Sequence, residues 1–291
     1  MIEYKVENHV SSFLPEHKKW KLVWSDEFDG DKLDESKWSF REYFWGKRSP
    51  TFTREGVYVD GGSNLHIAMI KRGEDYLSAQ LQTGSIVYDL PKDSKGFWPF
   101  GKIEEPKFMH KFGYYECRCK LPKNDGWHAA FWLQAPGIGS HPDPKYGGVE
   151  VDIMENYRQA REGNLICGCG WGGYGKDSKW FGHAVFPYVE TDDGWHTYAV
   201  DWSEEGYVFY ADGNVVSRQM APECAVSHVD EFILLTTECH GYNRIFGNES
   251  ADAGLAGDAD IWSGSPVEAL KKAVLPDEFI VDYVRVFDSV E

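Results

Sequence analysis

The segment Gly148–Tyr157 reads GVEVDIMENY, and its alternation of apolar and acidic residues predicts a β-strand. Its two valines and Ile153 fall on one face of such a strand, while Glu150 and Asp152 fall on the other. Strict alternation would turn Glu155 toward the apolar face, where an unpaired carboxylate is costly. A β-bulge at Ile153 and the following methionine adds one residue and returns Glu155 to the acidic face. We therefore predict a bulged strand that presents three carboxylates on one surface.

The rest of the chain shows the same pattern of short alternating segments separated by turn residues. The clearest segments are Asn64–Met69, Gly113–Leu121, Trp195–Trp202, Tyr207–Ala211, Phe232–Thr236 and Phe279–Phe287. Asp212-Gly213 predicts a two-residue hairpin turn, because such turns require positive φ. The only helix that we expect is short, Pro266–Val274. Many short strands with almost no helix predict an all-β antiparallel sandwich, with a polar lead-in over residues 1–19 and a single domain over residues 20–291.

The overall charge excludes some classes of partner. The 291 residues include 47 acidic residues against 30 lysines and arginines, a formal net charge of −17. Nucleic acids and anionic membranes need a basic surface, so we expect neither as a partner. No apolar run reaches the ~18 residues of a membrane span. The first residues lack the apolar stretch of a signal peptide, so we expect a protein that acts in the cytoplasm or one whose leader has been removed.

The six cysteines do not form a recognisable metal or redox motif. Cys117 and Cys119, like Cys167 and Cys169, are two residues apart, which differs from the CxxC spacing of such sites. On a strand, each pair falls on one face. We expect these residues to be small buried hydrophobic side chains.

Three carboxylates on one surface indicate acid–base chemistry. They repel one another, so that one can stay protonated while another stays ionised. Hydrolysis of a glycosidic bond with retention has this requirement, since it uses a nucleophile and an acid/base ~5–5.5 Å apart.

The acidic segment also resembles the bulged catalytic motif of glycoside hydrolase family 16, the group of laminarinases, agarases and porphyranases. Segments in the same order as in that family are Leu22–Gly30, Phe112–Pro122, Trp195–Trp202, Phe209–Gly213 and Val281–Phe287. The resemblance implies a β-jelly-roll sandwich of two curved antiparallel sheets with a concave substrate cleft. It also implies that Glu150 is the nucleophile, Asp152 a helper that hydrogen-bonds to it, and Glu155 the general acid/base.

Flat aromatic rings stack on sugar rings, so a cleft for sugars needs aromatic residues near the acids. Trp127 and Trp132 are the first candidates. The family usually spaces its two tryptophans four apart, whereas here they are five apart. On a regular strand this spacing puts them on opposite faces. An irregularity before the strand would allow both to face the cleft, and we expect both to bind substrate.

Other candidates for substrate binding come from loops and neighbouring strands. Trp171 lies in a run of glycines that permits close backbone approach, and His183 follows it. Glu238, followed by Cys-His, replaces an apolar and glycine-rich segment common in laminarinases and adds a carboxylate to the cleft floor. Further residues that could line the site are Trp45, Arg54 and Trp262, the last within the long loop Gly241–Gly264.

The resemblance further implies a structural Ca²⁺ on the convex side, held by Glu27 and Asp282. Carboxylate oxygens suit this hard cation. A buried hydrogen-bonded pair of acids is the alternative. We expect no cofactor for catalysis.

The leading hypothesis is an endo-acting, retaining β-glycanase that works as a monomer on a carbohydrate polymer or oligosaccharide. A β-1,3-linked or mixed-linkage β-glucan is the expected substrate. An agar- or porphyran-type or unsulfated β-galactan is the alternative, although sulfated galactans need clustered cations that the net charge of −17 argues against. A jelly-roll carbohydrate-binding protein without turnover is the hypothesis from another class.

Overall fold

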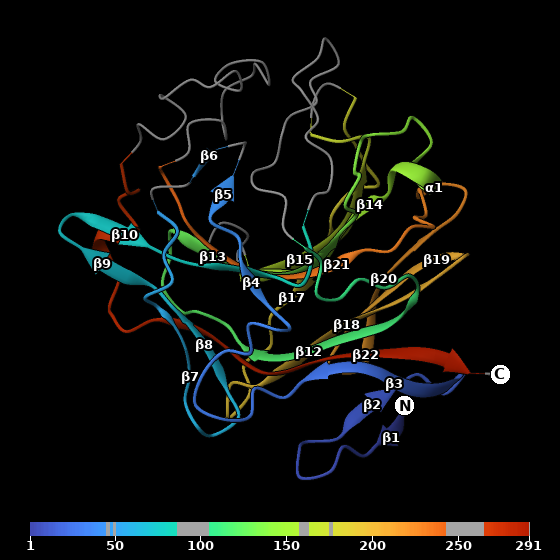
Figure 1. Cartoon of the computed structure of the whole chain (residues 1–291), viewed down its shortest axis with the longest axis horizontal. Coiled ribbons are helices and arrows are strands. Elements are labelled where there is room, and N and C mark those ends of the chain that lie inside the picture. Colours follow the sequence, from blue (N-terminus) through green and yellow to red (C-terminus); the bar gives the residue numbers. More distant parts are fainter. Residues whose placement is uncertain are drawn as a thin grey trace.

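Two large antiparallel sheets lie face to face in the computed structural model (Figure 1). The structure describes residues 1–44, 47–48, 51–85, 105–156, 163–174, 177–242 and 265–290. The sheet that carries the acidic segment, called the site sheet here, has the order β16 (Lys179–Trp180), β15 (Asn164–Trp171), β14 (Val149–Glu155), β13 (Trp127–Gln134), β21 (Phe232–Cys239), β11 (Gln80–Gln82) and β4 (Ser39–Phe40), with β17 (Ala184–Pro187) also beside β15.

The second sheet, called the back sheet, has the order β20 (Asn214–Met220), β19 (Gly206–Ala211), β18 (His196–Ser203), β12 (Gly113–Lys120), β22 (Glu278–Val290), β8 (Leu65–Ala68) and β7 (Val57–Val59), with β3 (Lys19–Asp26) also beside β22. Three small pairs accompany the two sheets: β1 (Ile2–Tyr4) with β2 (Ser12–Leu14), β5 (Tyr43–Phe44) with β6 (Lys47–Arg48), and β9 (Ile70–Arg72) with β10 (Asp75–Leu77). The predicted all-β sandwich is confirmed.

The core lies between the two sheets and follows the alternation of the sequence. Every second residue of β13, from Ala129 to Leu133, belongs to it, and Tyr115, Cys117 and Cys119 of β12 meet them from the other side. All six cysteines are buried and unpaired, as expected of small hydrophobic side chains. The residues between these positions therefore face away from the core, and on the site sheet they form the surface that carries the acids.

The predicted hairpin turn is present, and the predicted helix is largely absent. Asp212 and Gly213 join β19 to β20 with φ angles of 48° and 74°. In place of a helix over Pro266–Val274, only the 3₁₀ turn η2 (Leu270–Lys272) forms. A helix of this length is marginal in water, and Leu270 of the turn is buried in an apolar cluster. The one α-helix among the described residues is α1 (Pro144–Gly147).

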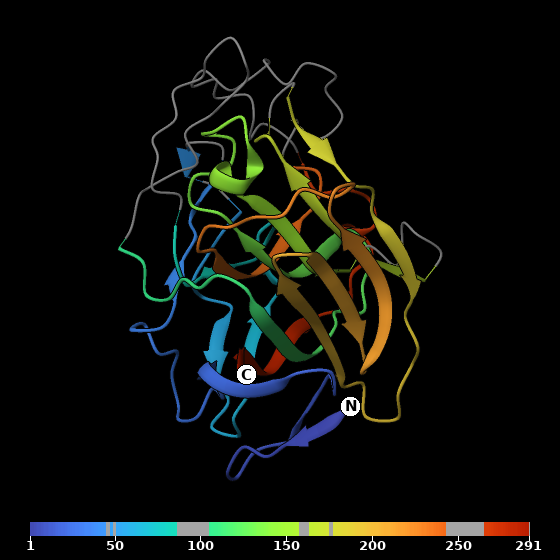
Figure 2. The same ribbon diagram turned by 90° about the vertical axis from the view of Figure 1, so that its right-hand side faces the viewer.

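Residues 1–19 pack against the outside of the back sheet (Figures 1 and 2). Leu14 lies in an apolar cluster that includes Tyr114 and Phe287 of the sheet. The fully buried Arg285 of β22 donates hydrogen bonds to the carbonyl oxygen of Val10 and the hydroxyl of Ser12. These contacts fix the lead-in on the face of the sandwich opposite the acids.

None of the helices in the described part of the chain has the length and apolar character to cross a membrane.

Candidate active site

The predicted bulge is present in β14 and puts Glu155 on the face of the other two acids. In the pairing of β13 with β14, Trp132 lies opposite Asp152. The residue before Trp132 lies opposite Met154, so Ile153 is the extra residue. The pairing of β14 with β15 shifts over the same positions. Ile153 and Met154 are both in the core, and the carboxylate of Glu155 thereby avoids burial among apolar side chains.

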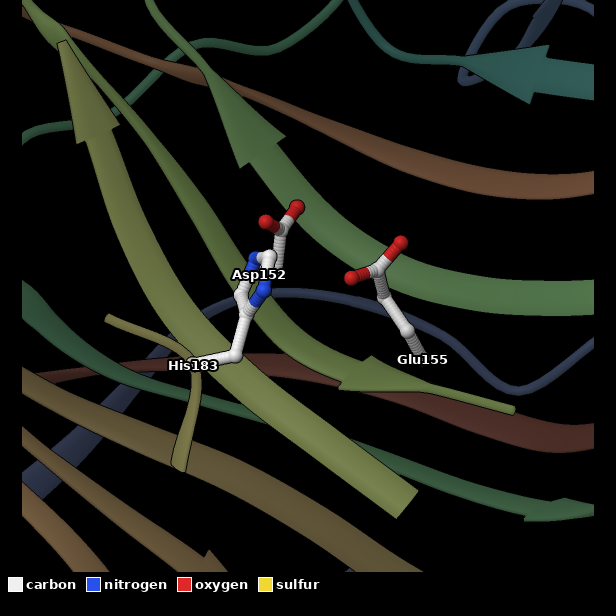
Figure 3. A group of neighbouring side chains, drawn as sticks. All are labelled: Asp152, Glu155 and His183. Carbon is white, nitrogen blue, oxygen red and sulfur yellow. The ribbon is translucent and has the colours of Figure 1, made fainter. Parts of the chain in front are cut away.

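Asp152 and Glu155 share their surface with His183, which lies between β16 and β17 (Figure 3). Possible ligand atoms of the three side chains all lie within 4.8 Å of one another. Asp152 is buried, Glu155 is partly buried and the imidazole is exposed. The structure therefore brings His183, which the sequence suggested for substrate binding, beside two of the acids.

Glu150 is held by a short chain of hydrogen bonds. Its side chain is 8% exposed. The hydroxyl of Tyr174 donates to Oε2 of Glu150, and Nε2 of Gln134 donates to the tyrosine oxygen. Burial raises the pKa of Glu150 to about 7, while the hydrogen bond from Tyr174 and the charge of Arg41 act in the opposite direction. The tyrosine therefore favours the ionised carboxylate.

The surroundings of Asp152 disfavour a charged carboxylate. Only 4% of its surface is exposed. Burial, and then the charges of Glu155 and Glu150, raise its pKa well above the usual range. These influences all favour the protonated form of Asp152, which in that form would relieve the repulsion with its two neighbours.

Arg41 supplies positive charge close to the acids. It is buried, and it lies just after β4 at the far edge of the site sheet. Its guanidinium carbon is 5.5 Å from the ring centroid of Trp132. Burial lowers the pKa of Arg41, and the charges of Glu238 and Glu150 oppose this shift. Sequence reasoning missed this residue, because its two-residue strand gives no periodic signal.

Trp132 lies where the sequence predicted, on the face of the acids. It is partly buried, and its Nε1 donates a hydrogen bond of 3.0 Å to Oγ1 of Thr236 on the next strand. Phe232 and Leu234 of that strand pack beside it. Trp132 therefore packs against a buried apolar cluster beside the acidic row.

The expectation that Trp127 also lines the site is wrong. It is 1% exposed and packs with Met69, Cys239 and Leu270 in a separate apolar cluster. Its Nε1 donates to Oδ2 of Asp277 at 3.1 Å. The strand stays regular from Trp127 onward along β21, so the five-residue spacing keeps the two tryptophans on opposite faces.

Trp171 does not line the site either. It is partly buried and packs against the main core. Along β15, it alternates in step with the core residues Cys167 and Cys169. The intervening glycines, not the tryptophan, face the same side as the acids, since Gly170 pairs with Glu150.

Gly168 and Gly170 leave space on the acidic face that two side chains from a neighbouring segment occupy. A Cβ at Gly170 would come within 2.8 Å of the Trp180 ring, and a Cβ at Gly168 within 2.9 Å of Cδ2 of His183. The two rings are 5.0 Å apart. Trp180 is 41% exposed and lies beside Glu150 on the acidic face, although sequence reasoning did not select it. The glycine run indicated a close approach but not which group approaches.

Glu238 lies on the same face, farther from the acids along the sheet. Nε2 of Gln80 donates to its Oε1 at 2.7 Å. His128, opposite it on β13, has Nδ1 3.2 Å from Nε2 of His240. Burial lowers the pKa of both histidines to about 4, so both are neutral at pH 7. This region is polar, and its side chains already contact one another.

The two acids suggested for calcium do not fit that ion. Glu27 accepts two hydrogen bonds from Arg285, at 3.0 and 2.7 Å. Asp282 accepts one from Arg118 at 2.6 Å. Each carboxylate is thus neutralised by its own arginine, and neither belongs to a group of three or more possible ligands among the described residues.

The sequence suggested three further candidates. Trp45 and Trp262 lie outside the described residues. Arg54 is exposed, pairs with Glu42 at 3.3 Å and lies over the ring of Phe40.

Comparison with known families is consistent with this geometry. Residues 51–228 match the sequence profile of "Glycosyl hydrolases family 16". The chain belongs to glycosyl hydrolase family 16. It is therefore a glycoside hydrolase by family, with a carbohydrate as its substrate.

Family 16 relatives align over most of the chain. Beta-porphyranase B of Zobellia galactanivorans is 24% identical over 84% of this chain and 81% of its own length. A beta-glucanase of Rhodothermus marinus is 25% identical over 94% of this chain and 86% of its own length. The laminarinase catalytic domain of Thermotoga maritima superposes with a TM-score of 0.62 at 22% identity, over 94% of this chain and all of that one. The last comparison shows the shared jelly-roll fold.

The hydrogen bond from Tyr174 gives this family 16 site a testable pH dependence. If the ionised Glu150 is the reactive form, kcat/KM falls as the pH drops through the pKa of that group. Substitution Tyr174→Phe removes a donor to the ionised form, so the pKa rises. A hydrogen bond to a charged group contributes ~1.5–3 kcal/mol, or ~1–2 pH units. We expect the acidic limb of the pH profile to move upward by about one unit or more.

The matched control is Tyr58→Phe, which removes an exposed hydroxyl bonded to Glu278 on the back sheet. Its pH profile should coincide with that of the unsubstituted enzyme. An acidic limb that stays in place in Tyr174→Phe would show that the hydroxyl does not set the charge state of Glu150.

Proposed function

We propose that the protein is a retaining, endo-acting β-glycanase. Glu150 acts as the nucleophile, Glu155 as the general acid/base, and Asp152 positions and tunes the nucleophile. The observation that carries the proposal is the bulge in β14, which brings all three acids onto one face. A retaining mechanism needs two carboxyl groups on that face, one ionised and one protonated in turn.

The surroundings support the assignment of roles. Tyr174 and Arg41 both favour the ionised form of Glu150, as a nucleophile requires. Burial and the neighbouring charges favour the protonated form of Asp152, which in that form can donate a hydrogen bond to a neighbouring carboxylate. Glu155 is partly buried, and the imidazole of His183 lies beside it. Glu155 is thus the acid best placed to protonate the leaving group of a substrate that enters from solvent.

A neutral β-glucan with β-1,3 or mixed linkages is the substrate that the geometry supports best. Beside the acidic row lies Trp132, with apolar neighbours on one flank. Among the described residues near the acids, the one arginine, Arg41, already interacts with Glu150 and Glu238. A sulfate group there would face several carboxylates. A relative from Niallia circulans, 27% identical over 66% of this chain and 28% of its own length, is a glucan endo-1,3-beta-glucosidase.

A porphyran- or agar-type β-galactan is the second candidate. The observation that favours it is the alignment with beta-porphyranase B over 84% of the chain.

A substrate panel tests the proposal directly. Laminarin, barley glucan, agarose and porphyran are incubated with the enzyme, and new reducing ends and product lengths are measured. We expect oligosaccharides of several lengths from laminarin or barley glucan. Glu150→Gln and Glu155→Gln should each lower the rate by at least about a hundredfold, the lower range of acid–base catalysis. Glu223→Gln, at an exposed site, is the matched control.

Turnover that survives in either of the first two variants would remove the catalytic assignment. No release of reducing ends from any of these polymers, with binding retained, would support a carbohydrate-binding protein instead.

Trp180 supplies a second aromatic platform in this proposal, beside the nucleophile. Its exposed ring lies over Gly170, which pairs with Glu150. We expect Trp180→Ala to raise KM about tenfold, the effect of ~1.4 kcal/mol of lost binding. Gly170→Ala should act in the same direction, because its new Cβ would displace the ring. Kinetics on oligosaccharides of defined length measure both.

The control is Trp195→Ala, a partly buried tryptophan that packs against Arg118 and Lys120 instead. A KM that is the same in Trp180→Ala and in the control variant would show that Trp180 is not a platform for substrate.

A further inference from the structure

The cluster of Asp152, Glu155 and His183 has a property that hydrolysis does not require. One imidazole and two carboxylates, from two different segments, converge with their ligand atoms within 4.8 Å of one another (Figure 3). Among the described residues, no other group of three or more histidine, cysteine, aspartate or glutamate side chains meets this distance.

Asp152 provides a second, independent observation. Its side chain is more than nine-tenths buried. Within the described residues, its carboxylate has no hydrogen bond or ion pair, and the groups that act on it are the two neighbouring acids. A buried carboxylate normally has a partner. A cation in the cluster would displace the proton that burial favours on this carboxyl and release it to solvent. It would then supply the missing partner and offset the repulsion between the acids.

The mixed donor set selects the kind of cation. Imidazole nitrogen with two carboxylate oxygens suits Zn²⁺ and related transition metals, whereas Ca²⁺ and Mg²⁺ prefer six or more oxygen ligands. Bonds of ~2.0–2.2 Å to Zn²⁺ place neighbouring ligand atoms ~3.4 Å apart. Closing the remaining distance requires the side chains of Glu155 and His183 to rotate about their bonds. Three ligands leave a fourth position for water.

The chain holds His183 in a suitable place. Gly168 pairs with Asp152 across β14 and β15, and the imidazole lies over that glycine, in the space a Cβ would take. The ring is exposed, so a hydrated ion can reach it from solvent.

We propose that Asp152, Glu155 and His183 bind a divalent transition-metal ion, and that the bound ion inhibits the hydrolase reversibly. The bound ion coordinates Glu155, the acid that would deliver the proton to the leaving group. Substrate and metal ion therefore exclude each other from the site. The inhibition rests on the proposed role of Glu155, whereas the binding of the ion does not.

Isothermal titration calorimetry of the full, untagged chain with ZnCl₂ tests the binding. We expect a site with a micromolar Kd in the unsubstituted protein. His183→Gln should weaken this site at least tenfold. Gly168→Ala should weaken it as well, because its Cβ would displace the imidazole. His17→Gln, which removes an exposed imidazole near Asp201, is the matched control and should bind as the unsubstituted protein does. CaCl₂ in place of ZnCl₂ should give at least tenfold weaker binding.

Equal Zn²⁺ affinity in the unsubstituted protein and in a folded His183→Gln or Gly168→Ala variant would overturn the metal site. Because calorimetry needs no turnover, this result is separate from a failure of the proposed hydrolysis.

The inhibition has its own readout. Hydrolysis by the unsubstituted enzyme should fall on addition of Zn²⁺, recover with EDTA, and be protected by excess oligosaccharide. His183→Gln, scaled to its own metal-free rate, should need at least tenfold more Zn²⁺ for the same loss. Binding of Zn²⁺ without loss of hydrolysis would overturn the inhibitory role.

Discussion

The extra residue in β14 is the constraint on which the rest of the site depends. A strand alternates its side chains, so three acids at positions 150, 152 and 155 cannot share a face without a break in register. The bulge at Ile153 provides that break and lets two consecutive apolar residues remain in the core. The same local feature thus protects the packing of the sandwich and assembles the acidic face. Loss of the bulge would bury Glu155 and separate it from its partners.

Gathering acids on one face has an electrostatic cost, and the surrounding residues offset it in different ways. Burial and two neighbouring acids raise the pKa of Asp152 and favour its protonated form. Glu150 is stabilised in its ionised form by the hydroxyl of Tyr174 and by the charge of Arg41. Glu150 and Asp152 therefore lie in different electrostatic environments, and such differences are the condition for dividing the roles of nucleophile and acid. The net charge of −17 does not indicate which of the acids is ionised, because the neighbouring residues determine the pKa of each one.

The sequence predicted the structural features that depend on the alternation of residues along a single strand. Alternation predicted the sandwich, and the cost of burying Glu155 predicted the bulge. The five-residue spacing on a regular strand correctly placed Trp127 and Trp132 on opposite faces. The expectation that both line the site was wrong because the strand stays regular. Tyr174 and Trp180 reach the acids from beyond the end of β15 and from a two-residue strand, and no periodicity specifies the course of such segments.

The central claim is that these acids carry out hydrolysis with retention, and the stereochemistry of the first product tests it most directly. Proton NMR during the first minutes of hydrolysis, before mutarotation, distinguishes the two anomers of the new reducing end. The bulged arrangement, with Glu150 as nucleophile, predicts that the β-anomer appears first. First appearance of the α-anomer would show inversion, which uses a water molecule between more widely spaced carboxyl groups, and would contradict the account.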